Sequence, residues 1–411
     1  MTAGERTRPH PESLPVGALL TALVALGQIS TSIYIPSMPS IAAEFSSTPA
    51  HVNLTLSGFL LGFAVSQLLF GPASDRFGRR PVLFAGLGLY LAASVLCALA
   101  SGIEMLIVGR VLQGMAACAG PVLGRAIVRD VYGAERTAAA MAWIGAALAV
   151  SPAVAPIIGG YLQEWFGWRA SFVFLMLVGI VLFAATGWLL SETSPRHGPG
   201  GGAPELHLAA DGFATTFLRL LADRRFLGYT LCVAFIFAGL MAYAAGGPFV
   251  FITLLGLSPS GYGMLAVFPV AGYLAGSIAA GRLSRRVPVA RLTAAGLAIS
   301  LCGGLGLVVP AAVAEPSVAA VVVPMMLFTA GLGIVLPTGM AGAMAPWPRV
   351  AGAASALLGC VQMLVAAGAS LAAGLLPAVS ALPMAAVITA SAGLAAAAFI
   401  ALVRCGPSPG H

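Results

Sequence analysis

Twelve long apolar segments constrain the fold of this chain more than any other feature of its sequence. Each is about as long as the roughly 20 residues that a helix needs to cross a bilayer. No water inside a bilayer pairs with backbone N–H and C=O groups, so only helices and closed barrels span it. Barrel strands alternate apolar and polar residues over about ten positions, whereas these segments are apolar throughout. The sequence therefore predicts an all-α membrane protein.

The composition excludes a soluble protein and argues against nucleic-acid binding. Of the 411 residues, 59% are hydrophobic and 8% are charged, whereas a soluble domain carries about 25% charge. All 20 basic residues are arginines, and they form no basic stripe with interleaved aromatic residues. We interpret the net charge of +7 as a signal of membrane topology.

The predicted spans form two sets of six, separated by the only long polar stretch of the chain. They are expected near 15–36, 52–70, 81–100, 103–127, 138–161, 170–190, 226–253, 262–281, 291–310, 318–341, 353–376 and 383–403. The expected organisation is a tail at 1–14, a bundle at 15–190, a linker at 191–225 ending in a short amphipathic surface helix, a bundle at 226–403 and a tail at 404–411.

Arginines gather in alternate loops and in both tails, whereas the opposite loops hold only Arg169. Loops rich in basic residues stay on the cytoplasmic side of a membrane. Both termini are therefore predicted to be cytoplasmic.

The charged segment 71–80 has a fixed pattern that is unusual for a loop between two spans. It resembles the loop after helix 2 of the major facilitator superfamily, G-x-x-x-D-R-x-G-R-[RK]. In that family the acid meets the start of helix 11, here near 351–353, when the cytoplasmic side is closed. The resemblance implies a gating role, and the alternative is that the segment only anchors topology. The matching residues are Gly71, Asp75, Arg76, Gly78, Arg79 and Arg80.

The chemistry of several residues in this segment predicts what each one does. Gly71 is expected to let two helices approach closely, and Gly78 to adopt a backbone conformation closed to other residues. A carboxylate near a helix N-terminus gains roughly 0.3–1 kcal/mol, which is enough for Asp75 to bias a two-state equilibrium. The segment 281–288 is a degenerate second copy in which Arg285 replaces the acid. Such a repeat implies two six-helix bundles with a site between them near the midplane.

Arg110 lies well inside an apolar span, with Gln113 and Gly114 on the same helical face. An arginine at the bilayer centre costs roughly 2.5–3.5 kcal/mol, so such residues usually face a cavity and serve a function. The trio resembles the R-x-x-Q-G motif of the same superfamily, on the helix that lines the central cavity. The alternative is that Arg110 snorkels to the outer interface.

The segment 151–160 resembles the antiporter motif G-x-x-x-G-P-x-x-G-G, which marks exporters in this superfamily. Its small residues allow close helix packing, and its prolines are expected to kink the span. A plain small-residue packing face is the alternative explanation. The matching positions are Ser151, Ala155, Pro156, Gly159 and Gly160, with Ser151 and Ala155 in place of glycines.

Three further segments narrow the resemblance to one branch of the superfamily. Residues 34–41, 125–130 and 351–356 resemble the ends of helices 1 and 4 and the start of helix 11 in the bicyclomycin/chloramphenicol-resistance (Bcr/CflA) drug:proton antiporters. The second segment implies a cytoplasmic network of Arg125, Arg129 and Asp130.

This resemblance implies a fold, a location and an activity. The implied fold is the major facilitator fold, with twelve transmembrane helices in two six-helix bundles. It implies a monomer in the bacterial inner membrane that exports small amphipathic drugs by alternating access. The energy source implied is the proton gradient, with no cofactor and no metal.

One position departs from the branch. Many members carry an acid in helix 1, four residues before the proline, but Ser32 stands there. A buried carboxylate suits proton transport because desolvation raises its pKa and a nearby arginine lowers it. The acid that carries the proton is therefore unassigned, and an unpaired Arg110 leads to the hypothesis of an anionic substrate. Positions expected to line the cavity are Arg110, Gln113, Gln28, Ser32, Tyr34, Met141, Tyr243 and Gln362.

Other function classes find less support in the sequence. A transporter of a single metabolite, exported or imported and possibly anionic, stays open as the alternative. No H-E-x-x-H or G-x-S-x-G motif points to a membrane enzyme. A chain without lysine cannot hold a Walker A motif, so ATP is not expected to drive it directly.

Overall fold

All secondary structure in the described part of the chain is helical, as its apolar segments predict. The computed structural model describes residues 13–132, 134–194, 213–313, 317–375 and 380–404. Within these residues, twelve helical segments are long and apolar enough to cross a membrane, and each coincides with a predicted span. The chain is therefore a multi-pass membrane protein of the expected all-α class.

Two of the first six spans are broken near their middle or end, each close to a proline. Proline lacks a backbone N–H and disturbs the helix that precedes it; Pro36 lies in a short 3-10 helix, and Pro121 lies near the start of α6. The elements of this half are α1 (Leu14–Ser32), η1 (Ile35–Ser37), α2 (Met38–Glu44), α3 (Pro49–Phe77), α4 (Arg79–Ala98), α5 (Ile103–Ala117), α6 (Ala119–Val131), α7 (Ala134–Phe166) and α8 (Arg169–Leu189).

The second half repeats this arrangement after a short helix, α9 (Phe213–Ala222). Two of its spans end in π-helical turns. Its elements are α10 (Arg224–Pro248), η2 (Phe249–Leu254), α11 (Pro259–Leu265), α12 (Val267–Leu283), α13 (Val289–Val313), α14 (Val318–Met344), η3 (Pro348–Val350), α15 (Ala351–Leu375), α16 (Leu382–Ala398) and η4 (Phe399–Arg404).

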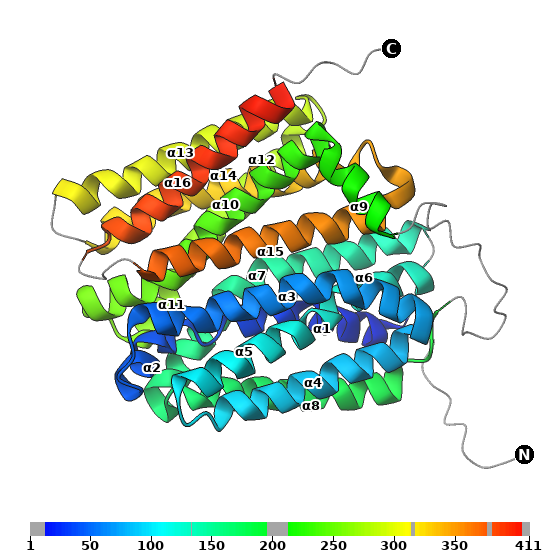
Figure 1. The fold of residues 1–411 in the computed structure, drawn as a ribbon, viewed down its shortest axis with the longest axis horizontal. Coiled ribbons are helices and arrows are strands. Elements are labelled where there is room, and N and C mark those ends of the chain that lie inside the picture. Colours follow the sequence, from blue (N-terminus) through cyan, green and yellow to red (C-terminus); the bar gives the residue numbers. More distant parts are fainter. Residues whose placement is uncertain (1–12, 133, 195–212, 314–316, 376–379, 405–411) are drawn as a thin grey trace, which may run out of the picture.

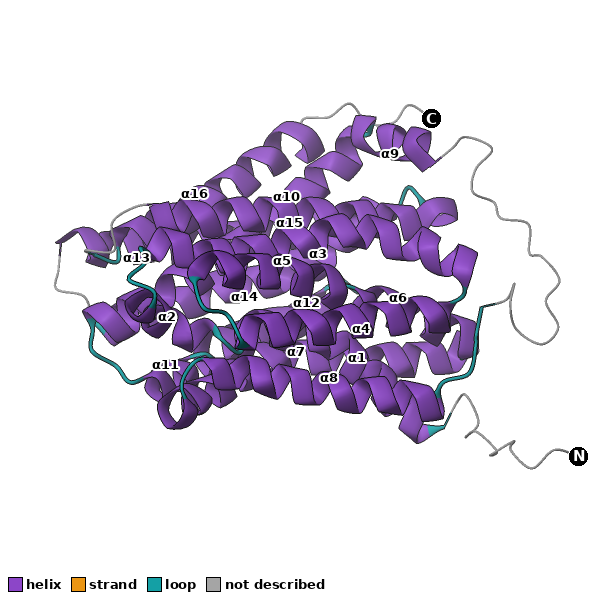
Figure 2. Ribbon diagram, turned by 60° about the horizontal axis from the view of Figure 1, so that its bottom comes forward, coloured by secondary structure: helices purple, strands orange, loops and turns teal. Residues whose placement is uncertain are grey.

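The helices run side by side between two ends of the molecule (Figures 1 and 2). We call them the Asp75 end, where α3 gives way to α4, and the Glu164 end, where α7 gives way to α8. Helices α3 and α5 pack together in the first half, and α12 and α14 in the second. The halves meet mainly through α3 against α15 and α7 against α11. In Figure 1, α10 and α16 slope away from the first half toward the Asp75 end.

The segment 71–80 is more helical than a turn between spans. Helix α3 continues to Phe77 and α4 begins at Arg79, so Gly78 alone separates them. Gly78 has a φ of 95°, the left-handed conformation that was expected of it. One glycine is enough to reverse the chain, because its positive φ turns the backbone between a helix that ends just before it and one that begins just after it.

The linker and tails are described only in part. Helix α9 lies where a short amphipathic helix was predicted, with Leu218 and Leu221 exposed on it. It contacts α10 and α15 of the second half. The rest of the predicted linker, at 195–212, and nearly all of both predicted tails lie outside the described residues.

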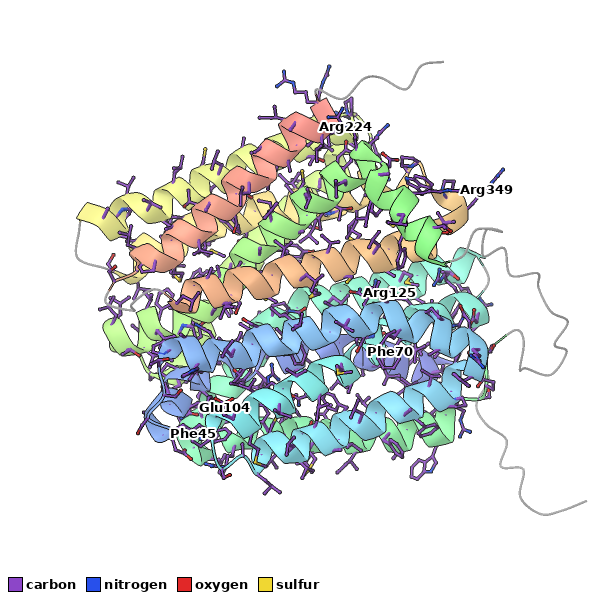
Figure 3. All side chains as sticks on the ribbon, viewed as in Figure 1. Phe45, Phe70, Glu104, Arg125, Arg224 and Arg349 are labelled. Carbon is purple, nitrogen blue, oxygen red and sulfur yellow. The ribbon has the colours of Figure 1, made fainter. Side chains whose placement is uncertain are left out.

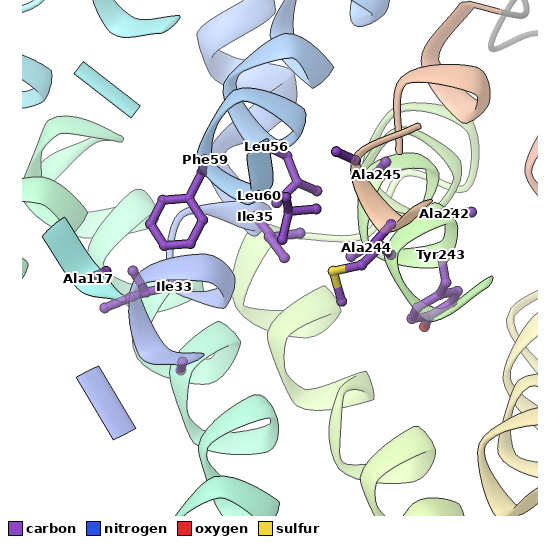
Figure 4. Close-up of a cluster of buried hydrophobic side chains, with 14 of the residues drawn as sticks. Ile33, Ile35, Leu56, Phe59, Leu60, Ala117, Ala242, Tyr243, Ala244 and Ala245 are labelled. Carbon is purple, nitrogen blue, oxygen red and sulfur yellow. The ribbon is translucent and has the colours of Figure 1, made fainter. Parts of the chain in front are cut away.

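An apolar seam joins the two halves within the membrane (Figure 4). Ile35, Leu56 and Leu60 of the first half are buried and face Ala244 of α10. Closer to the middle of the α3–α15 contact, a Cβ at Gly359 would strike the amide of Gln67. The seam contains no ion pair among the described residues, so the halves can separate there without breaking one.

Candidate functional site

Arg79 ties three helices together at the Asp75 end. Its Nη1 donates to Asp75 Oδ1 at 2.6 Å and to Ser74 Oγ at 2.6 Å, both on α3. Its Nε donates to Asp130 Oδ2 at 3.0 Å, on α6. The side chain of Asp75 is 44% exposed, whereas that of Asp130 is 14% exposed. Asp75 therefore stays accessible to solvent and to other partners.

Glu192 completes this network, although no sequence motif predicted its role. Its Oε1 accepts a hydrogen bond from Arg79 N at 2.9 Å, and its Oε2 accepts one from Arg80 N at 3.2 Å. The first N–H groups of a helix lack intrahelical partners, and the N-cap Gly78 has no side chain to offer α4. A usable signal was the acid just beyond α8, on the same side of the membrane as this uncapped helix start.

The predicted contact between Asp75 and the start of α15 is not made in this structure. Asp75 pairs with Arg79 instead. A Cβ added at Gly71 or at Gly352, near the start of α15, would meet no atom within 4 Å. The expectation that Gly71 brings two helices together is therefore wrong for this structure, because no neighbouring helix lies against the position of its Cβ.

Arg110 is fully buried inside the first half. Its guanidinium carbon lies 4.2 Å from the ring centre of Tyr34 and 4.3 Å from that of Phe59, and Phe172 lies at 5.9 Å. Its Nη1 donates to Ser30 O at 3.1 Å. Aromatic faces attract a cation without a carboxylate, which offsets part of the cost of burying it.

Gln113 is bound to Arg110, as the i, i+3 spacing predicts. Its Oε1 accepts from Arg110 Nη1 at 2.6 Å, and its Nε2 donates to Ser94 Oγ at 2.9 Å. Tyr90 hydroxyl lies 2.6 Å from Ser30 Oγ, next to the backbone carbonyl that Arg110 uses. This polar cluster connects α1, α4 and α5.

These contacts correct the expectation that Arg110 lines an open cavity. Its side chain has 0% exposure, so it neither snorkels nor faces open space in this structure. Tyr34 is buried against it, with its hydroxyl 3.0 Å from Thr55 Oγ1. The physical reason is that aromatic rings, one backbone carbonyl and one side-chain amide of its own bundle surround the cation and leave it no exposed surface.

The other predicted cavity residues stand apart from this cluster. Ser32, Tyr243 and Gln362 are buried, whereas Gln28 and Met141 are half-buried. Among the described residues, the side chains of Gln28, Ser32 and Gln362 have no hydrogen-bond partner. Tyr243 packs at 6.3 Å, ring to ring, against Phe251.

The segment 151–160 lies on α7, which stays helical through Pro156. A Cβ on Gly159 would strike the carbonyl oxygen of Ile33 in the same half, and one on Gly160 would strike the backbone of Pro259 in the other half. Ala155 is buried, and Ser151 bonds back to its own helix at 2.6 Å. The two adjacent glycines thus serve different contacts, one inside the bundle and one between the bundles.

Helix α11 also has a glycine, Gly263, at the point where it crosses α7. A Cβ on Gly263 would strike the carbonyl oxygen of Pro156. Close by, Glu164 Oε1 accepts a hydrogen bond from Ser260 N at 2.9 Å. Ser258 Oγ accepts from the next amide, Gly261 N, at 3.1 Å. The backbones of α7 and α11 are therefore in close contact at the Glu164 end, and one hydrogen bond joins them there.

The predicted Arg125–Arg129–Asp130 network forms only in part. Asp130 pairs with Arg79 of α4 rather than with an arginine of its own helix. Arg129 is exposed, and Arg125 is half-buried on α6. In the view of Figure 3, Arg125 lies in the region where the two halves face each other.

The acids of the described spans lie near helix ends. Glu104, for example, is exposed in the first turn of α5 (Figure 3). No group of three or more His, Cys, Asp or Glu residues in the described part could hold a metal ion. The site therefore combines carboxylate hydrogen bonds at both ends of the molecule with a buried cation between them.

Comparison with known proteins identifies the group to which these features belong. The pattern of the Major Facilitator Superfamily matches residues 20–370. Multidrug resistance protein D of Escherichia coli (strain K12) is 32% identical over 84% of this chain and 84% of its own length. A chloramphenicol resistance protein of Pseudomonas aeruginosa is 30% identical, with coverage of 87% and 84%. A bicyclomycin resistance protein homolog of Haemophilus influenzae is 27% identical, with coverage of 85% and 86%.

Solved structures agree in fold. A D-xylose-proton symporter superposes with a TM-score of 0.75 at 16% identity, covering 95% of this chain and 97% of that one. A bacterial homolog of the human lysosomal transporter Spinster, in an inward-facing and occupied conformation, gives 0.73 at 18% identity, with coverage of 95% and 96%. The names of the relatives confirm the resemblance to the Bcr/CflA branch and do not favour a transporter of a single metabolite.

Proposed function

This chain belongs to the Major Facilitator Superfamily, and on that premise we propose that it exports small amphipathic drugs in exchange for protons. The relatives named for multidrug, chloramphenicol and bicyclomycin resistance support this substrate class. The alternating arginines support the orientation, with the Asp75 end in the cytoplasm. The proposed location is the bacterial inner membrane, where the chain acts as a monomer.

One observation carries the mechanism: helices of the two halves are in backbone contact at the Glu164 end, whereas Gly71 and Gly352 at the Asp75 end meet no neighbouring atom. Gly160 and Gly263 bring α7 and α11 into backbone contact, and Glu164 bonds across that contact. Gly71 and Gly352 have open space around them at the other end. Such an arrangement fits the inward-open state of a transporter that rocks two bundles about a central site.

We propose that each end is held closed by the same kind of contact, in which an acid of the first half bonds to the start of a helix in the second half. We call such a contact a latch. Glu164, from the first half, holds an amide at the start of α11 in the second half when the outside is closed. Asp75, also from the first half, is proposed to reach the start of α15 when the cytoplasmic side closes. Only one latch is made at a time, so each favours one of the two states.

Proton coupling in this chain is proposed to use acids near the membrane surfaces. The described spans carry no acid in their apolar middle, and Ser32 occupies the position of the usual one. Asp75 and Asp130 share Arg79 as a partner. Protonation of either acid weakens its pair with Arg79 and frees the end of α3 to move. We propose no cofactor, because the proton gradient supplies the energy.

Reconstitution tests this proposal directly. The purified protein is placed in liposomes with an imposed pH gradient, and uptake of an amphenicol, a bicyclic antibiotic and a cationic dye is measured. Gradient-dependent movement of at least one drug is expected from the wild type. Asp75→Asn protein, inserted normally, is expected to move it more slowly. If no drug moves, or if transport ignores the gradient, the proposed activity is wrong while the fold stands.

A further inference from the structure

Three exposed arginines crowd the end of α12 and the chain that follows it. Arg282, Arg285 and Arg286 line a hollow of about 540 Å³ together with Gly281 and Leu283. Among the described residues, no carboxylate forms an ion pair with any of them. We call these three residues the Arg282 patch.

The matching segment of the first half, 71–80, contains an acid, whereas the segment 281–288 contains none. Arg79 is neutralised there by Asp75 and Asp130. From Arg224 to its end the sequence contains a single acid, Glu315, which lies outside the described residues between α13 and α14. The second half therefore presents a cluster of positive charge without an internal counterion.

The nearest acid before α10 along the sequence is already engaged. Asp223 caps that helix through hydrogen bonds from Arg225 N at 2.8 Å and Phe226 N at 3.2 Å. Its other oxygen accepts from Trp347 Nε1 at 3.0 Å. No described acid therefore neutralises the Arg282 patch in this structure.

An exposed apolar face of α12 leads to the patch. Val267, Ala271, Ala275 and Ile278 are exposed, and their spacing of three and four residues places them on the face that ends at Arg282. Ile278 is 53% exposed and Leu283 is 45% exposed. In a membrane-spanning helix such a face contacts acyl chains, so the arginines lie where a lipid headgroup would be.

We propose that the Arg282 patch binds the phosphate of an anionic phospholipid whose acyl chains lie along this face of α12. The planar guanidinium fork matches phosphate oxygens in pairs. Basic pockets on the cytoplasmic side of transmembrane helices attract anionic headgroups. The inference rests on the proposed orientation of the chain and not on the drug that it carries. A lipid fits better than a free anion because the exposed apolar face of α12 ends at Arg282.

Native mass spectrometry of the full-length protein in detergent tests this site. Phosphatidylglycerol and phosphatidylethanolamine of equal chain length are added to wild type, to R282Q/R285Q/R286Q and to the control R224Q/R349Q/R404Q. The control removes the same charge from other exposed positions at the same end, of which Arg224 and Arg349 are visible in Figure 3. Phosphatidylglycerol affinity is expected to fall at least about tenfold in the patch variant alone, since each arginine contributes to headgroup binding.

Three outcomes overturn the proposal. Unchanged phosphatidylglycerol binding in the patch variant excludes the site. An equal loss of affinity in the control variant shows that the net charge of this end, rather than the Arg282 patch, determines lipid binding. Inorganic phosphate that displaces the lipid at equal concentration identifies a free-anion site instead. If the triple variant does not insert, Arg285→Gln replaces it and is expected to show a smaller loss, whereas no loss excludes the site. Drug transport plays no part in the readout, so failure here is distinct from failure of the proposed function.

Discussion

At the residue scale, the burial of Arg110 without a carboxylate is the most unusual feature of the molecule. Two aromatic rings within 4.3 Å, one backbone carbonyl and one amide replace the missing acid. Its Nε and Nη2 have no hydrogen-bond partner in the described part of the chain. The contribution of this cation to transport therefore depends on the rings and polar groups that surround it.

The first prediction concerns one of those rings. Phe59→Leu removes a cation–π contact of Arg110 and is expected to destabilise the protein by about 0.5–2 kcal/mol more than an equivalent change without a cation. Phe328→Leu in the second half provides that control, because Phe328 is equally buried and has no cation–π contact. Thermal unfolding of both purified proteins measures the difference. Equal losses of stability would show that the rings only fill space around Arg110.

The second prediction concerns Glu192. Glu192→Gln removes the charge that holds the first amides of α4, so we expect a loss of about 0.5–2 kcal/mol, as for other helix caps. Glu104→Gln is the control, because Glu104 also lies at a helix start but has no hydrogen bond or ion pair in the described part of the chain. Chemical unfolding in detergent compares the two. A larger effect of the Glu104 change would contradict the capping role.

At the scale of elements, the crossing of α7 and α11 depends on glycines that bring two backbones into contact. Van der Waals packing drives helix association in lipid, so small residues at the crossing matter more than apolar ones. Gly160 faces Pro259, and Gly263 faces Pro156. The antiporter-like segment 151–160 thus acts through one residue between the halves and another, Gly159, within its own half.

The third prediction follows from this crossing. Gly160→Ala places a methyl group against the backbone of Pro259, so we expect closure of the Glu164 end to fail and drug transport to fall to a small fraction of the wild-type rate. Gly145→Ala is the matched control on the same helix, because a Cβ there meets nothing within 4 Å. Transport into proteoliposomes and the amount of inserted protein are measured for both. Full activity of the Gly160 variant would rule out a tight crossing during the cycle.

At the scale of the whole molecule, Glu164 of the first half bonds to the start of α11, and Asp75 of the first half is proposed to act on the start of α15 at the opposite end. Glu164 makes its contact in this structure, whereas Asp75 instead pairs with Arg79. An exposed carboxylate at a helix start contributes roughly 0.3–1 kcal/mol, which changes the ratio of two states by about two- to fivefold. Latches of this strength bias the equilibrium without stopping the exchange.

The fourth prediction is therefore a pair of opposite shifts. Glu164→Gln is expected to raise the fraction of molecules open at the Glu164 end by about two- to fivefold, and Asp75→Asn to lower it by a similar factor. Spin-label distances across each end measure these populations. Glu104→Gln is the control and is expected to change neither population. Glu104 also lies at the Glu164 end but bonds to no described residue. Shifts in the same direction for both acids would contradict opposed latches.

The spans, their pairing into halves and the special backbone of Gly78 could be predicted from the sequence. Each depends on local chemistry: a helix long enough for the bilayer, a repeat of charged segments, and a residue free to adopt a φ of 95°. The pairing of Arg110 with Gln113 was also predictable, because a helix fixes which residues share a face.

The partners of these residues could not be predicted in the same way. Phe59 and Phe172 surround Arg110 from helices remote in the sequence, and Glu192 caps a helix that begins 113 residues before it. The sequence determined that the chain is a two-part helical membrane protein, since lipid forces every backbone group to bond within its own helix. Only the tertiary structure decided that Arg110 is enclosed and that Glu164 bridges the halves, since those contacts depend on how separate helices pack.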